Sequence, residues 1–261
     1  MINIRTEEEI ELLRQNNELV SKTLAEVAKI IRPGIATKVL DRRAEEYIRD
    51  HGAKPGFLGY NGFPATLCIS VNDTVVHGIP SGYELRDGDI VSVDCGTYLH
   101  GYYGDSAFTF GVGEVSEPVQ RLLKVTRESL ELGIEAALSG ARVGHIGHAV
   151  QQHAERNGYS VVRELVGHGL GRNMHEDPEV PNYGLRGVGS KLRAGMVICI
   201  EPMVNMGSKN VYQDSDGWAI RTKDGKPSAH FEKAVAIREG QAALQLTTFD
   251  YIDEVLQRLN N

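Results

Sequence analysis

Apolar residues recur at helical spacing between positions 10 and 31, which predicts an amphipathic helix near the start of the chain. Thr6 followed by Glu9 has the spacing of a capping box, the pattern in which two residues satisfy free N–H groups at a helix N-terminus. Pro33-Gly34 is expected to end this helix. A second helix is predicted from about Thr37 to Asp50 on the same grounds.

From Phe57 to Phe110 the pattern changes to short β-rich runs between Gly, Asn and Pro turns, which is typical of strands. Helical spacing returns from Ser116 to about Leu138 and again from Val143 to Asn157. Strand-like runs then resume, so the order helix, helix, strands occurs twice. The clearest strand patterns lie at 66–71, 89–94, 107–110, 197–200 and 234–237.

An internal repeat follows from this order. Segment 85–94 aligns without a gap with segment 192–201: Leu, Arg and Gly match, and a carboxylate ends both. Short apolar strands can look alike by chance, but further echoes occur in the same order along the chain, which favours duplication. We therefore predict an α+β fold of one catalytic domain, 1–261, made of two pseudo-symmetric α-α-β halves at about 7–115 and 116–240.

The composition of the chain argues against several classes of protein. The chain has 261 residues and a formal net charge of −7, which argues against broad nucleic-acid binding. It contains no apolar run long enough for a transmembrane helix and no signal-peptide pattern, so we expect no membrane association. Three cysteines without a CxxC pair favour a reducing, cytoplasmic environment. We also expect a monomer.

Each predicted half carries two acidic residues at comparable places. Asp94 ends one strand and Asp105 follows a short turn, while Glu201 ends the equivalent strand and Glu232 precedes the last one. Four carboxylates brought together would repel one another, and two divalent cations would neutralise their charge. His168, between two glycines, is the obvious nitrogen ligand and would add affinity for Mn, Fe, Co or Zn.

Simpler interpretations exist for most of these residues. An aspartate after a strand is usually a turn former, and Glu232 could pair with a surface lysine. Glu201 is harder to dismiss, because a glutamate directly after an apolar strand has little structural reason to be there. His77 and His175 could be packing or loop residues. The remaining histidines are expected to have no role at a site: His51, His100, His145, His148, His153 and His230.

Motif searches exclude several enzyme classes, because the chain has no HExxH, GxSxG, Walker A or dinucleotide-binding pattern. At the residues above, and from about Glu8 to Glu239, the sequence strongly resembles the type I methionine aminopeptidases of the pita-bread fold. The motifs that carry the resemblance are Val76-His77-Gly78-Ile79-Pro80, 88–94, Gly104-Asp105, 167–172, Met174-His175-Glu176, Ile200-Glu201-Pro202 and Phe231-Glu232.

The resemblance implies a central curved antiparallel sheet and a site with two divalent metal ions, with Co, Mn, Fe, Zn or Ni as possible metals. The family's five ligands fall on Asp94, Asp105, His168, Glu201 and Glu232, of which Asp105 and Glu232 would bridge the ions. The implied reaction removes the N-terminal methionine from nascent polypeptides whose second residue is small.

The resemblance also assigns roles to other residues. Glu201 would carry the proton from the attacking water to the leaving amine, His175 would hydrogen-bond the scissile carbonyl, and His77 would contact the next peptide amide. The methionine side chain needs an apolar, polarisable pocket. By resemblance its wall includes Tyr60, Phe63, Cys68 and Trp218.

Some positions depart from the family pattern or leave a question open. Phe57 and Val76 stand where many relatives carry Cys, Met174 where many carry Phe, and Tyr103 where His is common, so the pocket shape is open. The stretch between Glu201 and Glu232 is longer than its counterpart and contains four basic residues. A solvated loop explains it, and contact with the ribosome surface is the sharper alternative. Its basic residues are Lys209, Arg221, Lys223 and Lys226.

Two other functions remain open from the sequence. One is a proline-specific aminopeptidase of the same fold, which shares the five ligands but usually has an additional N-terminal domain. The other is an inert peptide-binding protein of this fold, which should have lost ligands.

Overall fold

The computed structural model describes residues 2–259. Its helices are α1 (Glu7–Ala28), α2 (Thr37–Asp50), the short 3-10 helix η1 (Tyr60–Gly62), α3 (Glu117–Glu135), α4 (Val143–Arg156) and α5 (Asp250–Leu259). No helix within the described residues is both long and apolar enough to cross a membrane.

Within residues 2–259 the strands form four sheets in which every pairing is antiparallel. The first sheet contains β1 (Lys54–Pro55), β2 (Leu67–Val71), β4 (Ile90–Leu99) and β5 (Tyr102–Gly111). The largest contains β7 (Gly167–Gly169), β8 (Glu176–Val180), β9 (Val197–Ile200), β14 (Lys233–Ala236) and β15 (Leu244–Gln245). The two small sheets contain β3 (Thr74–Val76), β11 (Val211–Gln213) and β12 (Ile220–Thr222), and β6 (Ser160–Val161), β10 (Met203–Asn205) and β13 (Ser228–His230).

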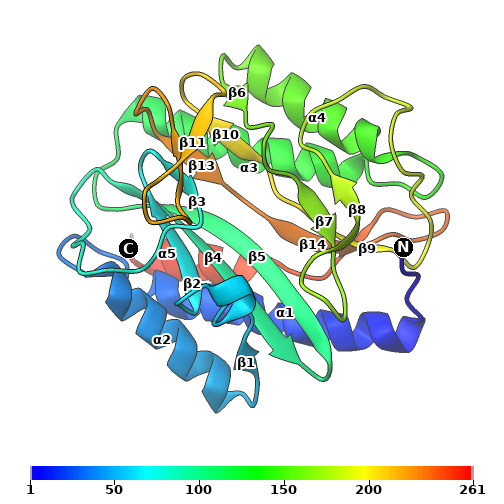
Figure 1. Ribbon diagram of the computed structural model, residues 1–261, viewed down its shortest axis with the longest axis horizontal. Helices are drawn as coiled ribbons and strands as arrows, with labels where there is room; N and C mark the ends of the chain where they lie inside the picture. The colour runs from blue at the N-terminus through cyan, green and yellow to red at the C-terminus, as the bar shows by residue number, and fades with distance from the viewer. Residues whose placement is uncertain (1, 260–261) are drawn as a thin grey trace.

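Helices cover the strands on two sides. Figure 1 shows α1 and α2 along one side of the strands and α3 and α4 along the other. Helix α1 packs on β4 and β5, and α3 packs on β9, β10 and β13, so each of these helices covers strands that come later in the chain. This is the α+β arrangement with antiparallel sheets that the sequence predicts.

The two sets of strands meet where β5 approaches the start of β14. The backbone N–H of Glu232 donates to the carbonyl of Ala107 at 2.9 Å, and the hydroxyl of Ser106 donates to the carbonyl of Glu232 at 2.6 Å. Next to this contact the ring of Phe108 packs against Phe231 at 4.9 Å between centroids. The junction therefore fixes the backbone on both sides of two predicted metal ligands, Asp105 and Glu232.

Most of the predicted elements are confirmed. The capping box of α1 is present, with Thr6 and Glu9 each accepting the other's backbone N–H, and α2 has the predicted bounds. Helix α1 ends at Ala28, earlier than the prediction from Pro33-Gly34, and β5 is longer than expected. Helix α5, which packs on α1, was not predicted.

Candidate metal centre and substrate cavity

The acidic residues lie together because of strand register. Strands β4 and β5 are adjacent, and Gly96 pairs with Asp105, so Asp94 is two residues along from that pair on the neighbouring strand. Strands β9 and β14 are also adjacent, with Ile200 paired to Lys233. Glu201 directly follows the first residue of this pair and Glu232 directly precedes the second, which places both at the same end of the two strands.

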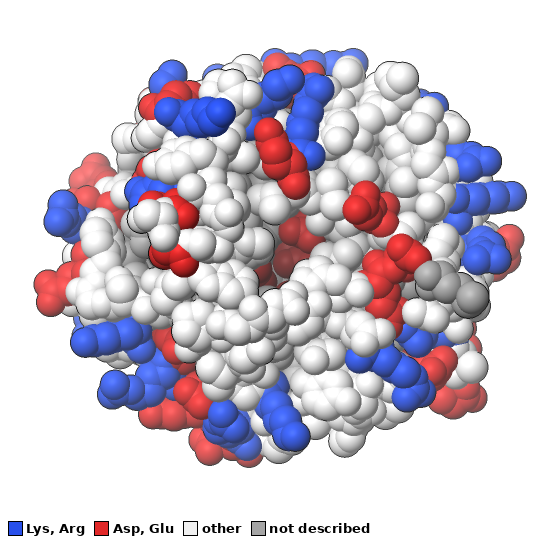
Figure 2. Space-filling model, in the orientation of Figure 1, with Lys and Arg blue, Asp and Glu red and all other residues white. Residues whose placement is uncertain are grey.

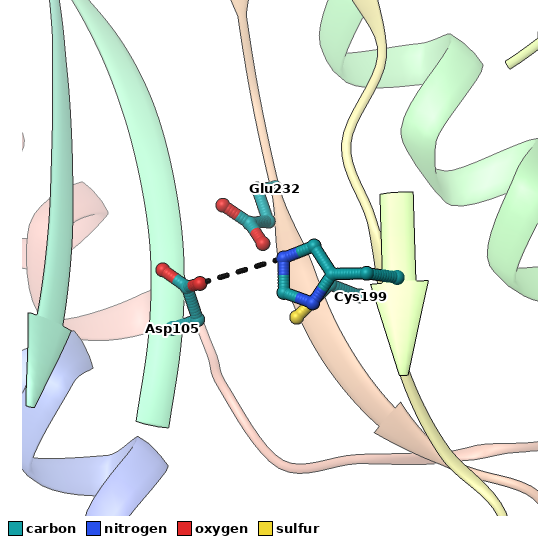
Figure 3. A group of neighbouring side chains, drawn as sticks. Asp105, Cys199 and Glu232 are labelled. Carbon is teal, nitrogen blue, oxygen red and sulfur yellow. Dashed lines mark ion pairs between the residues drawn. The ribbon is translucent and has the colours of Figure 1, made fainter. Parts of the chain in front are cut away.

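His168 comes from β7, which pairs with β9 and so lies beside Glu201. Its Nε2 atom is 3.6 Å from Oε1 of Glu201 and 3.7 Å from Oδ2 of Asp105. One ligand atom each from Asp105, His168, Cys199 and Glu232 lies within 4.8 Å of the others. Figure 3 shows the carboxylates of Asp105 and Glu232 facing this space from β5 and from the start of β14.

The hydrogen bonding and burial of His168 favour the neutral imidazole form that binds metal ions. Its Nδ1 lies 3.0 Å from the carbonyl oxygen of Gly169, which can only accept, so Nδ1 carries the proton and Nε2 presents a lone pair to the carboxylates. Burial lowers the pKa of His168 to about 4, which keeps the ring neutral at neutral pH. A neutral imidazole with one nitrogen anchored is the usual form of a metal ligand.

Several oxygens of the buried carboxylates have no hydrogen-bond partner among the described residues. One buried oxygen each of Asp94, Asp105 and Glu232 has no hydrogen-bond partner among the described residues. Burial raises the pKa of Asp94 to about 7 and of Glu201 to about 8. Burial and repulsion between neighbouring carboxylates raise the pKa values of Asp105 and Glu232 well above the usual range.

This donor set fits divalent cations. Buried carboxylates without partners are costly unless positive charge is supplied, and an oxygen-rich set with one neutral imidazole suits hard or borderline divalent ions. Cys199 lies among the ligands, but burial raises the pKa of its thiol well above the usual value. It is therefore protonated and can donate to Glu232 beside it.

One cavity has this cluster as its floor. Figure 2 shows a hollow near the middle of this face, with acidic atoms visible inside and mainly uncharged residues around it. Each residue to which the sequence assigns a role at the site lines this cavity: Tyr60, Phe63, Cys68, His77, Asp94, Asp105, His168, His175, Glu201, Trp218 and Glu232. Phe57 and Asn61 line it as well.

The cavity wall away from the carboxylates is apolar and aromatic. The rings of Phe63 and Trp218 pack edge to face with centroids 5.1 Å apart. Cys68 is buried on β2 directly opposite Asp94 on β4, so a soft sulfur lies beside the acidic floor. An unbranched, polarisable side chain suits such a wall.

Two predicted histidines, His77 and His175, line the same cavity as the proposed metal ligands. The ring of His175 packs edge to face on His168, with centroids 4.4 Å apart, and its Nδ1 is 2.8 Å from the hydroxyl of Tyr60. His77 follows β3 with φ of 59°, and burial lowers its pKa to about 4. Gly78 must follow it, because a Cβ at that position would lie 2.1 Å from the backbone oxygen of Ile69.

The sequence did not identify His230 as a residue near the site. We expected it to have no role, yet it is almost fully buried, and its Nε2 lies 3.6 Å from Oε2 of Glu201. Proximity in the sequence was the available signal, because His230 ends β13 only two residues before Glu232, which was already a candidate ligand.

One of the four basic residues between Glu201 and Glu232 already forms an ion pair within the chain. Arg221 forms a bidentate ion pair with Asp73, in which Nη2 donates to Oδ1 at 2.7 Å and Nε donates to Oδ2 at 3.1 Å, and it also contacts Asp214. Its guanidinium is therefore engaged within the chain. The other three basic side chains of this stretch are exposed: Lys209, Lys223 and Lys226.

Comparison with known proteins identifies the family of this chain. The model of metallopeptidase family M24 matches residues 11–239. The chain belongs to this family. A methionine aminopeptidase of Clostridium perfringens is 55% identical, over 91% of this chain and 95% of that protein. The solved structure of a methionine aminopeptidase from Thermotoga maritima is 43% identical, with a TM-score of 0.93, and covers 95% of this chain and 100% of that one.

A more distant M24-like structure bears on the proline-specific alternative. A prolidase from Pyrococcus furiosus is 25% identical, with a TM-score of 0.77 over 94% of this chain. The match covers only 65% of the prolidase chain. The likeness therefore supports the shared fold, and the nearly full-length matches are to methionine aminopeptidases.

Proposed function

We propose that this metallopeptidase removes the N-terminal methionine from other polypeptides when their second residue is small. The observation that carries the proposal is the cavity itself: a floor of buried carboxylates without partners lies beside a soft aromatic wall that contains Trp218 and Cys68. Matches of nearly full length to methionine aminopeptidases support it.

Five residues would hold the two divalent ions: Asp94, Asp105, His168, Glu201 and Glu232. When bound, divalent ions at such a site lower the pKa of a water and polarise a carbonyl.

Glu201 is the proposed proton carrier. It accepts a proton from the attacking water and passes it to the amine that leaves when the peptide bond breaks. Its backbone carbonyl is held by the side-chain amide of Asn182 at 3.0 Å, which fixes the start of the side chain beside His168.

His175 is proposed to donate a hydrogen bond to the scissile carbonyl. Nδ1 can accept the hydroxyl proton of Tyr60, which leaves the Nε2–H to act as donor. His77 is proposed to hydrogen-bond the amide beyond the scissile bond. With the substrate held between these histidines and the floor, little space remains for a large second side chain.

Several finer expectations belong to this proposal. We infer one catalytic domain of two halves, about 7–115 and 116–240, acting as a cytoplasmic monomer on nascent chains. Because Arg221 is engaged by Asp73, a contact with the ribosome surface would depend on the exposed lysines Lys209, Lys223 and Lys226.

A metal-replacement assay tests the proposal. The purified protein is treated with a chelator, its metal content is measured, and activity is assayed on Met-Ala-Ser, Met-Leu-Phe and Ala-Pro peptides with and without added Mn, Co or Fe. The expected result is metal-dependent cleavage of Met-Ala-Ser alone. Cleavage of Ala-Pro would favour the proline-specific alternative. Full metal occupancy without cleavage of any peptide would favour a binding protein.

A further inference from the structure

The carboxylate of Glu201 lies between two imidazole rings. Oε1 is 3.6 Å from Nε2 of His168, and Oε2 is 3.6 Å from Nε2 of His230. His168 also lies 3.7 Å from Oδ2 of Asp105, whereas the ring of His230 lies near Asp94, with which it interacts electrostatically. The two oxygens of the proposed proton carrier therefore face different partners.

His230 is held rigidly at this position. It ends β13, and its backbone N–H donates to Oγ1 of Thr109 at 2.9 Å, while the same hydroxyl donates to the His230 carbonyl at 2.7 Å. The residue is only 2% exposed. The imidazole therefore cannot turn out to solvent to satisfy its polar atoms.

Nε2 of His230 has no hydrogen-bond partner among the described residues. A buried polar atom left without a partner costs about 1–3 kcal/mol, so such an atom in a functional site needs an explanation. The Oε2 atom of Glu201 is the acidic oxygen within ion-pair distance of it in the described chain. Hydrogen bonds at catalytic sites are often long without substrate and shorten in the working complex.

We propose that His230 is a positioning residue, which donates its Nε2–H to Oε2 of Glu201 and fixes the orientation of that carboxylate. This inference rests on the proposed function, in which Glu201 carries the proton. With Oε2 held by His230, the carboxylate cannot rotate, and Oε1 stays directed toward His168 and the attacking water. His230 does not bind metal in this arrangement, in contrast to His168.

The kinetic test uses two substitutions that differ in one property. His230→Gln keeps an N–H donor close to the place of Nε2, and His230→Leu fills similar space without a donor. We expect kcat of His230→Leu to fall about 10–100-fold with KM changed less than about 3-fold, and His230→Gln to retain kcat within about 5-fold. Both should keep the metal content of the wild type. Equal loss of kcat in both variants, or loss of metal in either, would overturn the inference.

A spectroscopic test does not depend on turnover. In protein labelled with ¹⁵N-histidine and loaded with diamagnetic Zn²⁺, the His230 ring is assigned from the signals missing in His230→Gln. We expect the Nε2–H tautomer, and we expect Glu201→Ala to move this ring's Nε2 signal most among the histidines other than His168. An Nδ1–H tautomer, or direct coordination of Zn²⁺ by His230, would contradict the proposal even if the leucine variant fails to fold.

The two tests separate failure of this inference from failure of the proposed function. Wild-type protein that binds metal but cleaves no methionyl peptide refutes the function, and the tautomer measurement still decides whether His230 holds Glu201. Active wild-type protein with an Nδ1–H tautomer refutes the role of His230 alone.

Discussion

Arg5 and Glu176, which are 171 positions apart in the sequence, form an ion pair whose side chains are 7% and 6% exposed. The Glu176 carboxylate also accepts the side-chain amide of Asn3 at 2.6 Å and the backbone N–H of Asn173 at 3.1 Å. Glu176 directly follows His175. The segment that precedes α1 therefore braces the turn that carries a proposed catalytic histidine.

Arg5→Ala should destabilise the protein and lower its turnover. Removing one partner of a buried ion pair leaves a charge without compensation, which typically costs about 3 kcal/mol or more. We expect this loss in urea unfolding, together with a fall in kcat at unchanged metal content, because His175 loses its support. Arg258→Ala, at an exposed pair with Glu254, is the control and should change neither quantity. Wild-type kcat in Arg5→Ala would show that the turn around His175 is independent of the N-terminal segment.

The sequence predicts much of this molecule for identifiable reasons. Caps and apolar spacing place α1 and α2 because helix signals are local. Four carboxylates and His168 could be proposed as metal ligands because acidic residues stand at comparable places in the two repeated segments, and the resemblance to a known family implies the same five residues. The ion pair of Arg5 with Glu176 could not be predicted, because a contact between distant segments has no local signature.

Phe57, which lines the cavity, and Met174 both pack closely against Gly96 of β4. A Cβ at Gly96 would lie 2.5 Å from the ring of Phe57 and 2.8 Å from the terminal methyl of Met174. Phe57 and Met174 were noticed in the sequence as departures from the family pattern. Their dependence on a glycine in β4 appears only when the segment after β1 and the segment between β7 and β8 pack against β4.

Gly96→Ala should therefore strain the cavity wall. Overpacking a buried site typically costs about 1–3 kcal/mol, and here relief requires Phe57 to move, which alters the cavity that it lines. We expect lower thermal stability and a raised KM for methionyl peptides. Gly82→Ala is the matched control, because no atom lies within 4 Å of its added Cβ and its φ is not positive. An unchanged KM in folded Gly96→Ala would show that Phe57 does not shape the substrate site.

Asp41 offers a prediction about pH. Its Oδ1 accepts the backbone N–H groups of Thr66 and Leu67 at 3.0 and 2.8 Å, at the start of β2. Burial raises the pKa of Asp41, which means that the folded state binds this proton more tightly than the unfolded state. The contribution of Asp41 to stability therefore falls as pH rises from the unfolded pKa through the folded one, and stays lower above it.

Asp41→Asn should remove this penalty. The amide oxygen can still accept both N–H groups, and no charge is buried, so the variant should equal or exceed the wild type in unfolding free energy at pH 7. The difference between the two should shrink as pH falls below the folded pKa, where Asp41 is neutral in both states. Asp41→Ala, which leaves both N–H groups without a partner, should lose about 2 kcal/mol. A wild type more stable than Asp41→Asn at pH 7 would mean that the charge itself stabilises this turn.

His77 combines a strained backbone with a proposed contact to substrate. Its φ of 59° lies in the left-handed region, where asparagine is tolerated better than most residues. His77→Asn should therefore keep the fold and the metals while removing the imidazole. His77→Ala should lose the imidazole and also about 1 kcal/mol of stability through backbone strain.

Both His77 variants should lower kcat about 10–1,000-fold, more than they raise KM, because a hydrogen bond that orients the peptide tightens toward the transition state. His100→Asn is the matched control, since His100 has a φ of 55° but lies on an exposed turn between β4 and β5. Metal content, thermal unfolding and kcat are measured on the same preparations. Loss of metal in His77→Asn would make His77 a ligand, and near-normal kcat with lowered stability would make it a packing residue.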